Sequence, residues 1–311
     1  MGDGADASGD SPATLARLLR CPQCGADVSI EAARAVCGDG LHHFPVVEGI
    51  PVLLDEHALA ADPQYDRQRR YFDAQFAGYA AYRLENWRRS YLERLRSAGV
   101  LGDARAPLLD VGVGGSGYTV IEAARAGHRA IGCDLSLEGL VAARRFAHAE
   151  AVADRTLWVC CSAERLPFAP ASFSSVLAVA VIEHVPDDLA ALREMARVLR
   201  PGGGAWVTVP HALHNVSPVF RVPNRLHDRH LGHLRRYEAD TLVEAGHSAG
   251  LSATDVQFTG HPIKVLQLAA AGMLRGDVGD RFWWWCEAGD LRRARSRRGS
   301  MQLSVLFRRA E

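Results

Sequence analysis

A glycine-rich turn and the carboxylate that follows it are spaced as in sites that bind an adenosine-containing cofactor. Residues 107–117 read PLLDVGVGGSG, so an apolar run leads directly into closely spaced glycines. Glycine has no Cβ, and its backbone can therefore approach a ligand closely. Asp134 lies 22 residues after Gly112, at the end of the next apolar run. At about this spacing, an acidic residue hydrogen-bonds the ribose hydroxyls of a dinucleotide or related cofactor.

Each of these two features also has a purely structural interpretation. The glycines are compatible with a tight strand-to-helix turn that binds nothing, and Asp134 is compatible with a helix-capping role just before Ser136. The two features together favour a cofactor site. NAD satisfies the same spacing as other adenosine cofactors, so the spacing alone does not choose among them.

Near the N-terminus, cysteines are spaced for metal binding. Cys21 and Cys24 are separated by two residues, and Cys37 follows after twelve more. Thiolates in this arrangement close on one tetrahedral zinc ion, which needs a fourth ligand. Residue 40 is glycine, which leaves His42 and His43 as candidates. The alternative is a metal-free knuckle that the apolar segment 44–54 holds in place.

From residue 107 onward, short apolar runs alternate with helical stretches. Runs that are apolar at nearly every position are typical of strands buried on both faces. Strands are expected at 107–112, 129–133, 156–161, 175–181, 205–209, 252–258 and 302–308. Helices are expected at 62–100, 117–126, 136–150, 187–199 and 238–249. This alternation predicts a doubly wound α/β fold with a mostly parallel seven-stranded sheet.

Along the chain, we expect three parts. Residues 1–15 are small, acidic and glycine-containing, and predict a disordered tail. Residues 16–60 form a small zinc-ribbon-like module, and residues 61–311 form the α/β domain. Two stretches of that domain, 211–236 and 261–299, are longer than the alternation requires. Insertions at strand ends commonly build the substrate side of a pocket.

The α/β domain closely resembles class I S-adenosylmethionine-dependent methyltransferases of the type-11, quinone-biosynthesis-like kind. The resemblance covers about residues 105 to 258, and the motifs occur in family order at family spacing. They are DxGxG at 110–114, Asp134, SAERLPF at 162–168, Ser172-Phe173, EHVPD at 183–187 and RVLRPGG at 197–203. Residues 21–54 resemble the zinc-ribbon-like modules that precede or activate some methyltransferases. In those with a histidine, it stands two residues before the Phe, which points to His42.

This resemblance implies S-adenosylmethionine as the cofactor and assigns residues to it. They are Asp110, Gly112, Gly114, Asp134, Leu135, Ser162, Ala163 and Ile182. Asp110 would lie beneath the methionine amino group, Asp134 would bind the ribose, and Ala163 would meet adenine by its backbone amide. Either Ile182 or Glu183 would lie near the methionine end. Many relatives carry Asp at the position of Ser162, whose hydroxyl would accept a weaker hydrogen bond from adenine.

Methyl transfer needs a base only when the acceptor arrives protonated. Candidate residues for that role are His184, His211, His233 and Tyr237. Each also has a structural interpretation, such as capping a turn or bracing the next helix. The segment FWWWCE at 282–287 could wall an apolar acceptor pocket or clamp the second insertion to the domain. We expect the segments 211–237 and 261–299 to roof this pocket together, with His184 at its floor.

The amino-acid composition gives no sign of a nucleic-acid or membrane partner. Lys and Arg total 36, as do Asp and Glu, so no net field gathers nucleic acid or anionic lipid. No apolar run reaches 18 residues, and we expect a cytoplasmic protein without a membrane partner. The favoured function is methylation of a small-molecule acceptor in a biosynthetic pathway; a homodimer is left open. The first alternative is an RNA methyltransferase, which the basic run 291–298 favours. The second is a cofactor-binding activator subunit.

Overall fold

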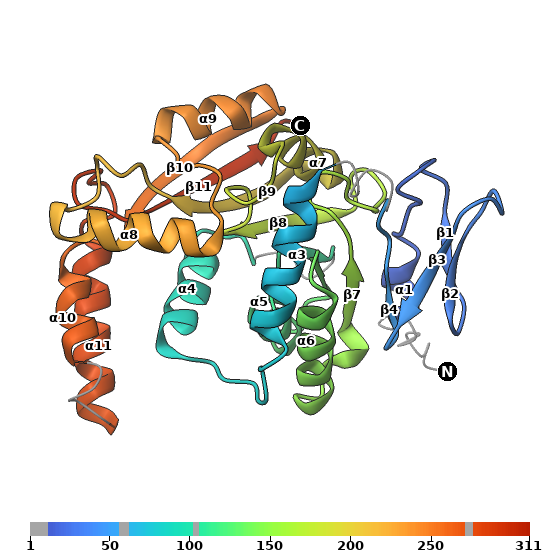
Figure 1. Cartoon of the computed structure of the whole chain (residues 1–311), viewed down its shortest axis with the longest axis horizontal. Coiled ribbons are helices and arrows are strands. Elements are labelled where there is room, and N and C mark those ends of the chain that lie inside the picture. The colour runs from blue at the N-terminus through green and yellow to red at the C-terminus, as the bar shows by residue number, and fades with distance from the viewer. Residues whose placement is uncertain (1–11, 56–61, 102–105, 271–275) are drawn as a thin grey trace, which may run out of the picture.

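The computed structural model describes residues 12–55, 62–101, 106–270 and 276–311, and it contains two β-sheets (Figure 1). The larger sheet has seven strands. In spatial order they are β10 (Leu251–Thr259), β11 (Gln302–Arg309), β9 (Leu199–Pro210), β8 (Phe173–Val179), β5 (Leu108–Val111), β6 (Ala130–Asp134) and β7 (Thr156–Cys160). Only β11 runs antiparallel to its neighbours. The predicted doubly wound, mostly parallel fold is therefore confirmed.

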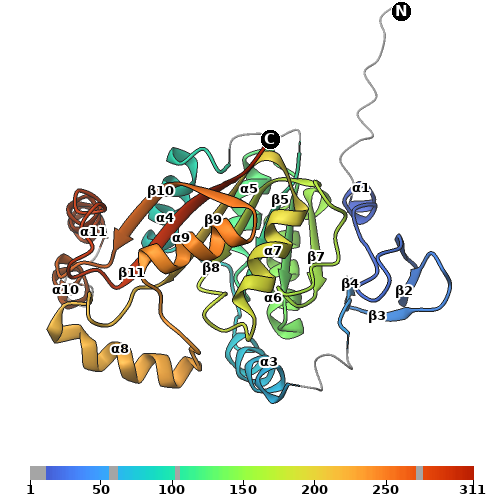
Figure 2. The same cartoon turned by 90° about the horizontal axis from the view of Figure 1, so that it is seen from above.

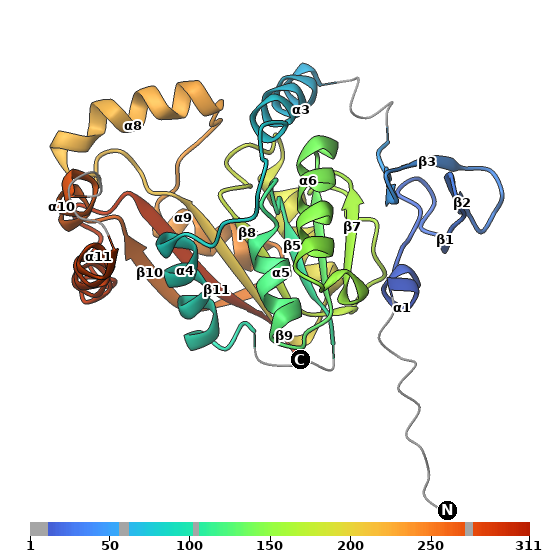
Figure 3. The same cartoon turned by 90° about the horizontal axis from the view of Figure 1, so that it is seen from below.

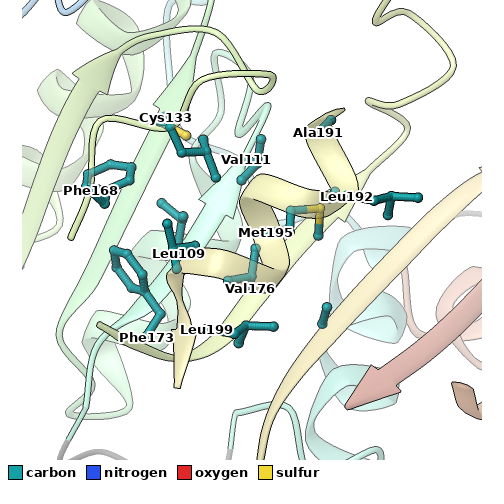
Figure 4. Packing of buried hydrophobic residues seen from close by; sticks show 14 of the residues in the cluster. Leu109, Val111, Cys133, Phe168, Phe173, Val176, Ala191, Leu192, Met195 and Leu199 are labelled. Atoms are coloured by element: carbon teal, nitrogen blue, oxygen red, sulfur yellow. The ribbon is translucent and has the colours of Figure 1, made fainter. Parts of the chain in front are cut away.

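Helices cover both faces of this sheet, as the apolar strand runs require. One face carries α4 (Asn86–Ser97), α5 (Tyr118–Arg125) and α6 (Leu137–Ala149). The other face carries α7 (Asp188–Val198) and α9 (Ala239–Ser248). In Figure 4, Met195 of α7 lies close to Val176 of β8, and Leu192 of α7 belongs to the same buried cluster. This packing anchors the two central strands.

Strand order identifies where a ligand should bind. The chain enters the large sheet at β5 and adds β6 and β7 on one side of it. It then returns to place β8 and β9 on the other side of β5. The loops after β5 and β8 therefore diverge and leave a crevice at the carboxyl ends of these strands. The glycine-rich turn follows β5, and Asp134 ends β6.

The N-terminal module lies along the β7 edge of the sheet (Figure 2). It consists of helix α1 (Pro12–Ala16) and strands β1 (Val28–Ile30), β2 (Arg34–Cys37), β3 (His43–Val47) and β4 (Ile50–Pro51). The Leu53 amide donates to the Cys160 carbonyl at 2.8 Å, and the Arg20 amide donates to the Pro167 carbonyl at 2.9 Å. Most of the module's buried residues share a hydrophobic cluster with one face of the large sheet, and Ile50 and Leu54 join the cluster on the other face.

Part of the tail expected to be disordered is ordered. Residues 12–16 form α1, and Leu15 is buried against the module and the sheet. Burial of this leucine offsets the entropy cost that the tail's composition alone cannot meet. Residues 1–11 lie outside the described residues.

The helical stretch expected at 62–100 is two helices, α3 (Pro63–Phe76) and α4. Asp62 caps α3 by accepting the Gln64 amide, and Pro63 occupies the first turn. The helix ends just before Gly78, a poor helix former. The break lets α3 lie over the carboxyl ends of the strands while α4 packs on the sheet (Figure 3).

Helix α7 ends one residue earlier than expected, and Pro201–Gly204 belong to β9 rather than to a loop after the helix. The two insertions are helical. The first contains α8 (Pro218–Leu231), and the second contains α10 (Ile263–Ala270) and α11 (Gly276–Leu291). Figures 1 and 2 place α10 and α11 beside the β10 edge, across the sheet from the module. No helix among the described residues has the length and apolar character needed to cross a bilayer.

Candidate functional site

A cavity of about 380 Å³ lies at the carboxyl ends of β5, β6, β7 and β8. Six of the eight predicted cofactor residues line it: Gly112, Gly114, Asp134, Leu135, Ser162 and Ala163. They come from three separate loops that the parallel strands bring to one edge. A cavity at this switch point is where an α/β sheet binds its ligand.

The carboxylate of Asp134 is oriented by the glycine turn. Its Oδ2 accepts the Gly114 amide at 2.8 Å, and its Oδ1 accepts the Ser136 amide at 2.9 Å. A carboxylate has about four acceptor positions, so both oxygens can accept further hydrogen bonds. Burial raises the pKa of Asp134, and the backbone N–H groups oppose this rise. The side chain is thus held where two ligand hydroxyls could donate to it.

At Gly112, the turn requires glycine. Its φ is +67°, and a Cβ there would lie 2.4 Å from Cγ2 of Val181. Any other residue would both strain the backbone and collide with the loop after β8. The backbone of the turn can therefore lie directly against whatever fills the cavity.

Asp110 and Ile182 do not line the cavity. Asp110 is buried below the turn and accepts a hydrogen bond from the Thr119 hydroxyl. Burial raises the pKa of Asp110 to about 7. Ile182 is in the hydrophobic core, and its neighbour Val181 lines the cavity instead.

Helix α3 forms the side of the cavity opposite the strand ends. Tyr65, Gln68, Phe72 and Phe76 all line it, at intervals of three or four residues. The ring of Phe76 packs on the glycine turn, since a Cβ on Gly115 would lie 2.9 Å from it. The sequence-based assignment missed these residues. Their helical spacing was the available signal, but it does not show which surface the helix faces.

The N-terminus of α6 anchors α3. The Ser136 hydroxyl donates to Asp73 Oδ1 at 2.6 Å, and the Glu138 amide donates to the same oxygen at 3.3 Å. Tyr65 and Ser162 share a hydroxyl–hydroxyl contact of 3.4 Å across the cavity wall. Helix α3 is thereby tied to the loops after β6 and β7.

At the other end of the cavity, His184 lies on the wall. Its ring is 5.3 Å from that of Phe72 and 4.7 Å from that of His233. Burial lowers the pKa of His184 to about 3, so this imidazole is uncharged at neutral pH. Glu183 is fully buried beside it, and burial raises the pKa of Glu183 to about 8. Neither carboxyl oxygen of Glu183 has a hydrogen-bond partner.

The other predicted catalytic residues are not on the cavity wall. His211 is fully buried and shares a hydrogen bond with the Ser300 hydroxyl at 2.7 Å. The Tyr237 hydroxyl donates to Asp188 at 2.6 Å. Both side chains thus fasten loops of the fold. His233 lies behind His184 and contacts the cavity only through it.

The expectation that the tryptophans and the two insertions roof the pocket is wrong for the described residues. None of the residues that line the cavity comes from 211–237 or 261–299. Phe282 and the tryptophans belong to α11, which packs against α10 and α4 at the β10 edge. Buried polar contacts hold that insertion, such as the Ser90 hydroxyl donating to Glu287 at 2.6 Å. Helix α3 occupies the place that the insertions were expected to fill.

In the module, the four predicted metal ligands converge. Cys21, Cys24, Cys37 and His42 each offer a ligand atom, and these atoms all lie within 4.8 Å of one another. The Sγ atoms of Cys24 and Cys37 are 3.3 Å apart, and Cys21 Sγ is 3.6 Å from His42 Nδ1. His43 is exposed on β3 and is not in this cluster. Three thiols and one imidazole at this spacing fit a tetrahedral zinc ion.

The fold and the cavity are those of an α/β protein with a candidate ligand site at the switch point of its sheet. Residues 109–207 match the family model described as a methyltransferase domain. This match identifies the segment as a methyltransferase domain, and the seven-stranded topology is that of the class I S-adenosylmethionine-dependent methyltransferases. The class binds S-adenosylmethionine, and the cavity described above lies where the predicted residues for it converge.

Individual relatives are more distant. The methyltransferase GfsG of Streptomyces halstedii is 33% identical over 178 residues, 56% of this chain and 63% of that protein. The tRNA 5-carboxymethoxyuridine methyltransferase of Escherichia coli K12 is 36% identical over 104 residues, 33% of this chain and 40% of that protein. The chain thus spans less than two thirds of these relatives.

Among solved structures, geranyl diphosphate C-methyltransferase from Streptomyces coelicolor is 17% identical, with a TM-score of 0.55. The alignment covers 80% of this chain and 99% of that one. At this identity the similarity concerns the fold alone. It does not indicate a shared acceptor.

Proposed function

We propose that the protein transfers a methyl group from S-adenosylmethionine to a small-molecule acceptor. The observation that carries the proposal is the single cavity that reaches from Asp134 at one end to His184 at the other. Its strand side fits a nucleoside and an amino-acid chain, and its α3 side is apolar and aromatic. One ligand held at the glycine turn and a second against α3 would meet inside one enclosed space.

The cofactor would supply a methyl group on a positively charged sulfur, which an acceptor attacks in line as the carbon–sulfur bond breaks. The protein's contribution to such a reaction is orientation and exclusion of water. Asp134 would accept hydrogen bonds from the ribose, and Leu135 and Ala163 would border the adenine. Phe72, Phe76 and Trp87 would cover the reacting centre, and His184 would contact the acceptor.

An RNA acceptor is the alternative that the tRNA-modifying relative suggests. Two arginines of the basic run 291–298 form ion pairs within the protein. Arg297 lies 2.8 Å from Asp240, and Arg295 pairs with Asp255. These contacts fix α9 and β10 and reduce the charge available to phosphates. The mostly apolar lining of the cavity also favours a small acceptor over a nucleic acid.

We also propose that the module binds one structural zinc ion through Cys21, Cys24, Cys37 and His42. Four protein ligands leave no open coordination position, so such an ion would stabilise the fold without taking part in the reaction. The module lies against the β7 edge, away from the cavity walls described above. We further propose that the module and the α/β domain form one rigid unit.

Cofactor binding tests the proposed function directly. S-Adenosylhomocysteine should bind the purified protein, NAD should not compete, and Asp134→Ala should weaken binding by about 1–3 kcal/mol. This loss is expected because the substitution removes the charged acceptor of two ribose hydroxyls. Isothermal titration calorimetry measures the change. Asp154→Ala, at an exposed aspartate remote from the cavity, is the matched control and should leave affinity unchanged.

Equal affinity in wild type and Asp134→Ala would remove Asp134 from the site. Transfer of the labelled methyl group to bulk tRNA, but not to an extract of small metabolites, would replace the small-molecule proposal with the RNA alternative.

A further inference from the structure

The region behind His184 contains a cluster that the proposed methyl transfer leaves unexplained. Glu183, His184 and His233 each offer one ligand atom, and these atoms lie within 4.8 Å of one another. The three residues come from two loops that are far apart in sequence, one after β8 and one after α8. The Leu234 amide donates to the Glu183 carbonyl at 2.9 Å, which holds the two loops together.

Glu183 is the least expected member of the cluster. Its side chain is fully buried, yet both carboxyl oxygens lack a hydrogen-bond partner. His184 Nδ1 is also buried without a partner. Buried polar atoms almost always have partners, because leaving one unpaired costs about 1–3 kcal/mol. Three such atoms at one place indicate that a bound group outside the polypeptide satisfies them.

His233 is oriented as a metal ligand would be. Its Nδ1 is 2.8 Å from Asp228 Oδ1, so the Nδ1–H donates to the carboxylate and Nε2 keeps its lone pair. Arg236 holds Asp228 in turn, with Nε 2.7 Å from Oδ2 and Nη2 2.8 Å from Oδ1. A carboxylate behind a histidine fixes the ring and its tautomer in most metal sites.

Charge balance points the same way. The Arg236–Asp228 pair is internally neutral, and the two imidazoles carry no charge in their ligand form. A carboxylate at Glu183 would therefore lie buried without a hydrogen-bonded counter-ion, which is costly. A divalent cation between the three side chains would satisfy all of the unpaired atoms at once.

We propose that Glu183, His184 and His233 form a binding site for one divalent transition-metal ion beside the cofactor cavity, with Asp228 as a positioning residue. Two imidazoles and one carboxylate hold first-row divalent ions and leave coordination positions open. Bonds of about 2.0–2.2 Å require a slightly tighter spacing than the one observed. Small rotations of the three side chains provide it.

For a role in the reaction, the open positions would have to reach the cavity beside His184, which lies on its wall. An acceptor with an ionisable hydroxyl would then bind the ion through its oxygen, which favours loss of the hydroxyl proton to water. The oxygen would form its bond to the methyl carbon as the carbon–sulfur bond of the cofactor breaks, leaving a neutral thioether. This assignment of the acceptor class rests on the proposed function, whereas the metal site does not.

Manganese binding to the full-length protein tests the site. Mn²⁺ prefers nitrogen and oxygen ligands to thiolates, so it discriminates against the cysteine cluster. Titration followed by electron paramagnetic resonance should show one bound Mn²⁺ per chain. Glu183→Gln and His233→Asn should each weaken binding by at least tenfold, and Asp228→Asn by about tenfold. Pulsed measurements should show imidazole nitrogen coupled to the ion, reduced in His233→Asn.

Two controls separate this site from others. His230→Asn changes an exposed histidine on α8, the helix that carries Asp228, and Cys24→Ser changes the cysteine cluster; both should keep Mn²⁺ affinity. S-Adenosylhomocysteine affinity, measured on every variant, shows whether the cavity has kept its shape. Glu183→Gln preserves side-chain volume, and His233→Asn changes a different loop, so failure of both to fold is not expected.

Absence of bound Mn²⁺ in the wild type would overturn the proposal, as would unchanged affinity in Glu183→Gln and His233→Asn. If S-adenosylhomocysteine binds while Mn²⁺ does not, only the metal site is wrong. If Mn²⁺ binds while S-adenosylhomocysteine does not, the metal site stands and the proposed methyl transfer fails.

Discussion

Asp110 shows how position can separate two carboxylates of one predicted cofactor site. Asp110 and Asp134 both come from cofactor-family motifs, yet Asp134 lines the cavity and Asp110 lies beneath it. Asp110 lies within β5, before the glycine turn, whereas Asp134 is the last residue of β6, where the strand ends at the cavity. Asp110 is held by the Thr119 hydroxyl at the start of α5. Its contribution is therefore to the turn that the cofactor would touch.

Stability of the ligand-free protein should depend on pH through Asp110. Burial raises its pKa to about 7, so between pH 4 and 7 the folded protein keeps a proton that the unfolded chain has lost. This contribution to stability is complete below pH 4 and is lost as pH rises to 7. Asp110→Asn is never charged and keeps the hydrogen bond from Thr119. The free energy of unfolding of Asp110→Asn, relative to that of the wild type, should therefore rise by roughly 2–4 kcal/mol between pH 4 and 7.

Urea unfolding of both proteins at several pH values measures this difference. A constant difference between wild type and Asp110→Asn from pH 4 to 7 would show that Asp110 is already ionised in the folded protein.

At the scale of elements, helix α3 has the role that the insertions were expected to play. Its aromatic residues face the cavity, and Asp73 ties it to the first turn of α6. The second insertion instead extends the β10 edge, where Arg297 and Glu287 bind it to the domain. Because α3 forms one side of the cavity, a displacement of this helix would change the shape of an acceptor pocket there.

Removing the α3 side chain that packs on the glycine turn should therefore weaken cofactor binding. Phe76→Ala removes a ring that packs on Gly114, Gly115 and Gly139, and S-adenosylhomocysteine affinity should fall about tenfold. Trp285→Ala, at a half-exposed residue of α11, should change neither affinity nor turnover. Calorimetry and a methyl-transfer assay check both variants. A large loss of turnover in Trp285→Ala would restore the tryptophans to the acceptor site.

For the whole molecule, the module is part of one core. Leu15, Leu19 and Phe44 of the module belong to the same buried cluster as Leu157 and Phe168 of the large domain. The module also covers β7, the edge strand of the sheet, where unpaired backbone groups would otherwise be open to another chain. Loss of the proposed zinc ion should therefore reach beyond residues 12–55.

His42→Asn tests this coupling. The variant should lose zinc by elemental analysis and should lower the thermal midpoint of the entire protein, because module and sheet share one core. His43→Asn changes the exposed neighbour and should retain both zinc and midpoint. Differential scanning calorimetry distinguishes one shifted transition from two separate ones. A separate low-temperature transition for the module alone would contradict the shared core, and equal zinc in both variants would contradict the ligand assignment.

The sequence by itself determined the sheet and most of the cofactor-side residues. Their signals are local: unbroken apolar runs for β5 to β9, and a glycine turn followed at fixed spacing by Asp134. The cysteine spacing likewise predicted the four side chains that converge in the module. Each of these features depends on neighbours in the chain and on where parallel strands end.

Only the tertiary structure decided what closes the cavity and what lies behind it. Helical periodicity placed Tyr65, Phe72 and Phe76 on one face but did not show that this face covers the glycine turn. The meeting of Glu183 with His233 depends on two loops that are separated in the chain by α7, β9 and α8. The placement of 261–299 was decided by packing at the β10 edge, and that of 211–236 by contacts with α3 and the loop after β8. No local pattern encodes either placement, because the surfaces involved are distant in the chain.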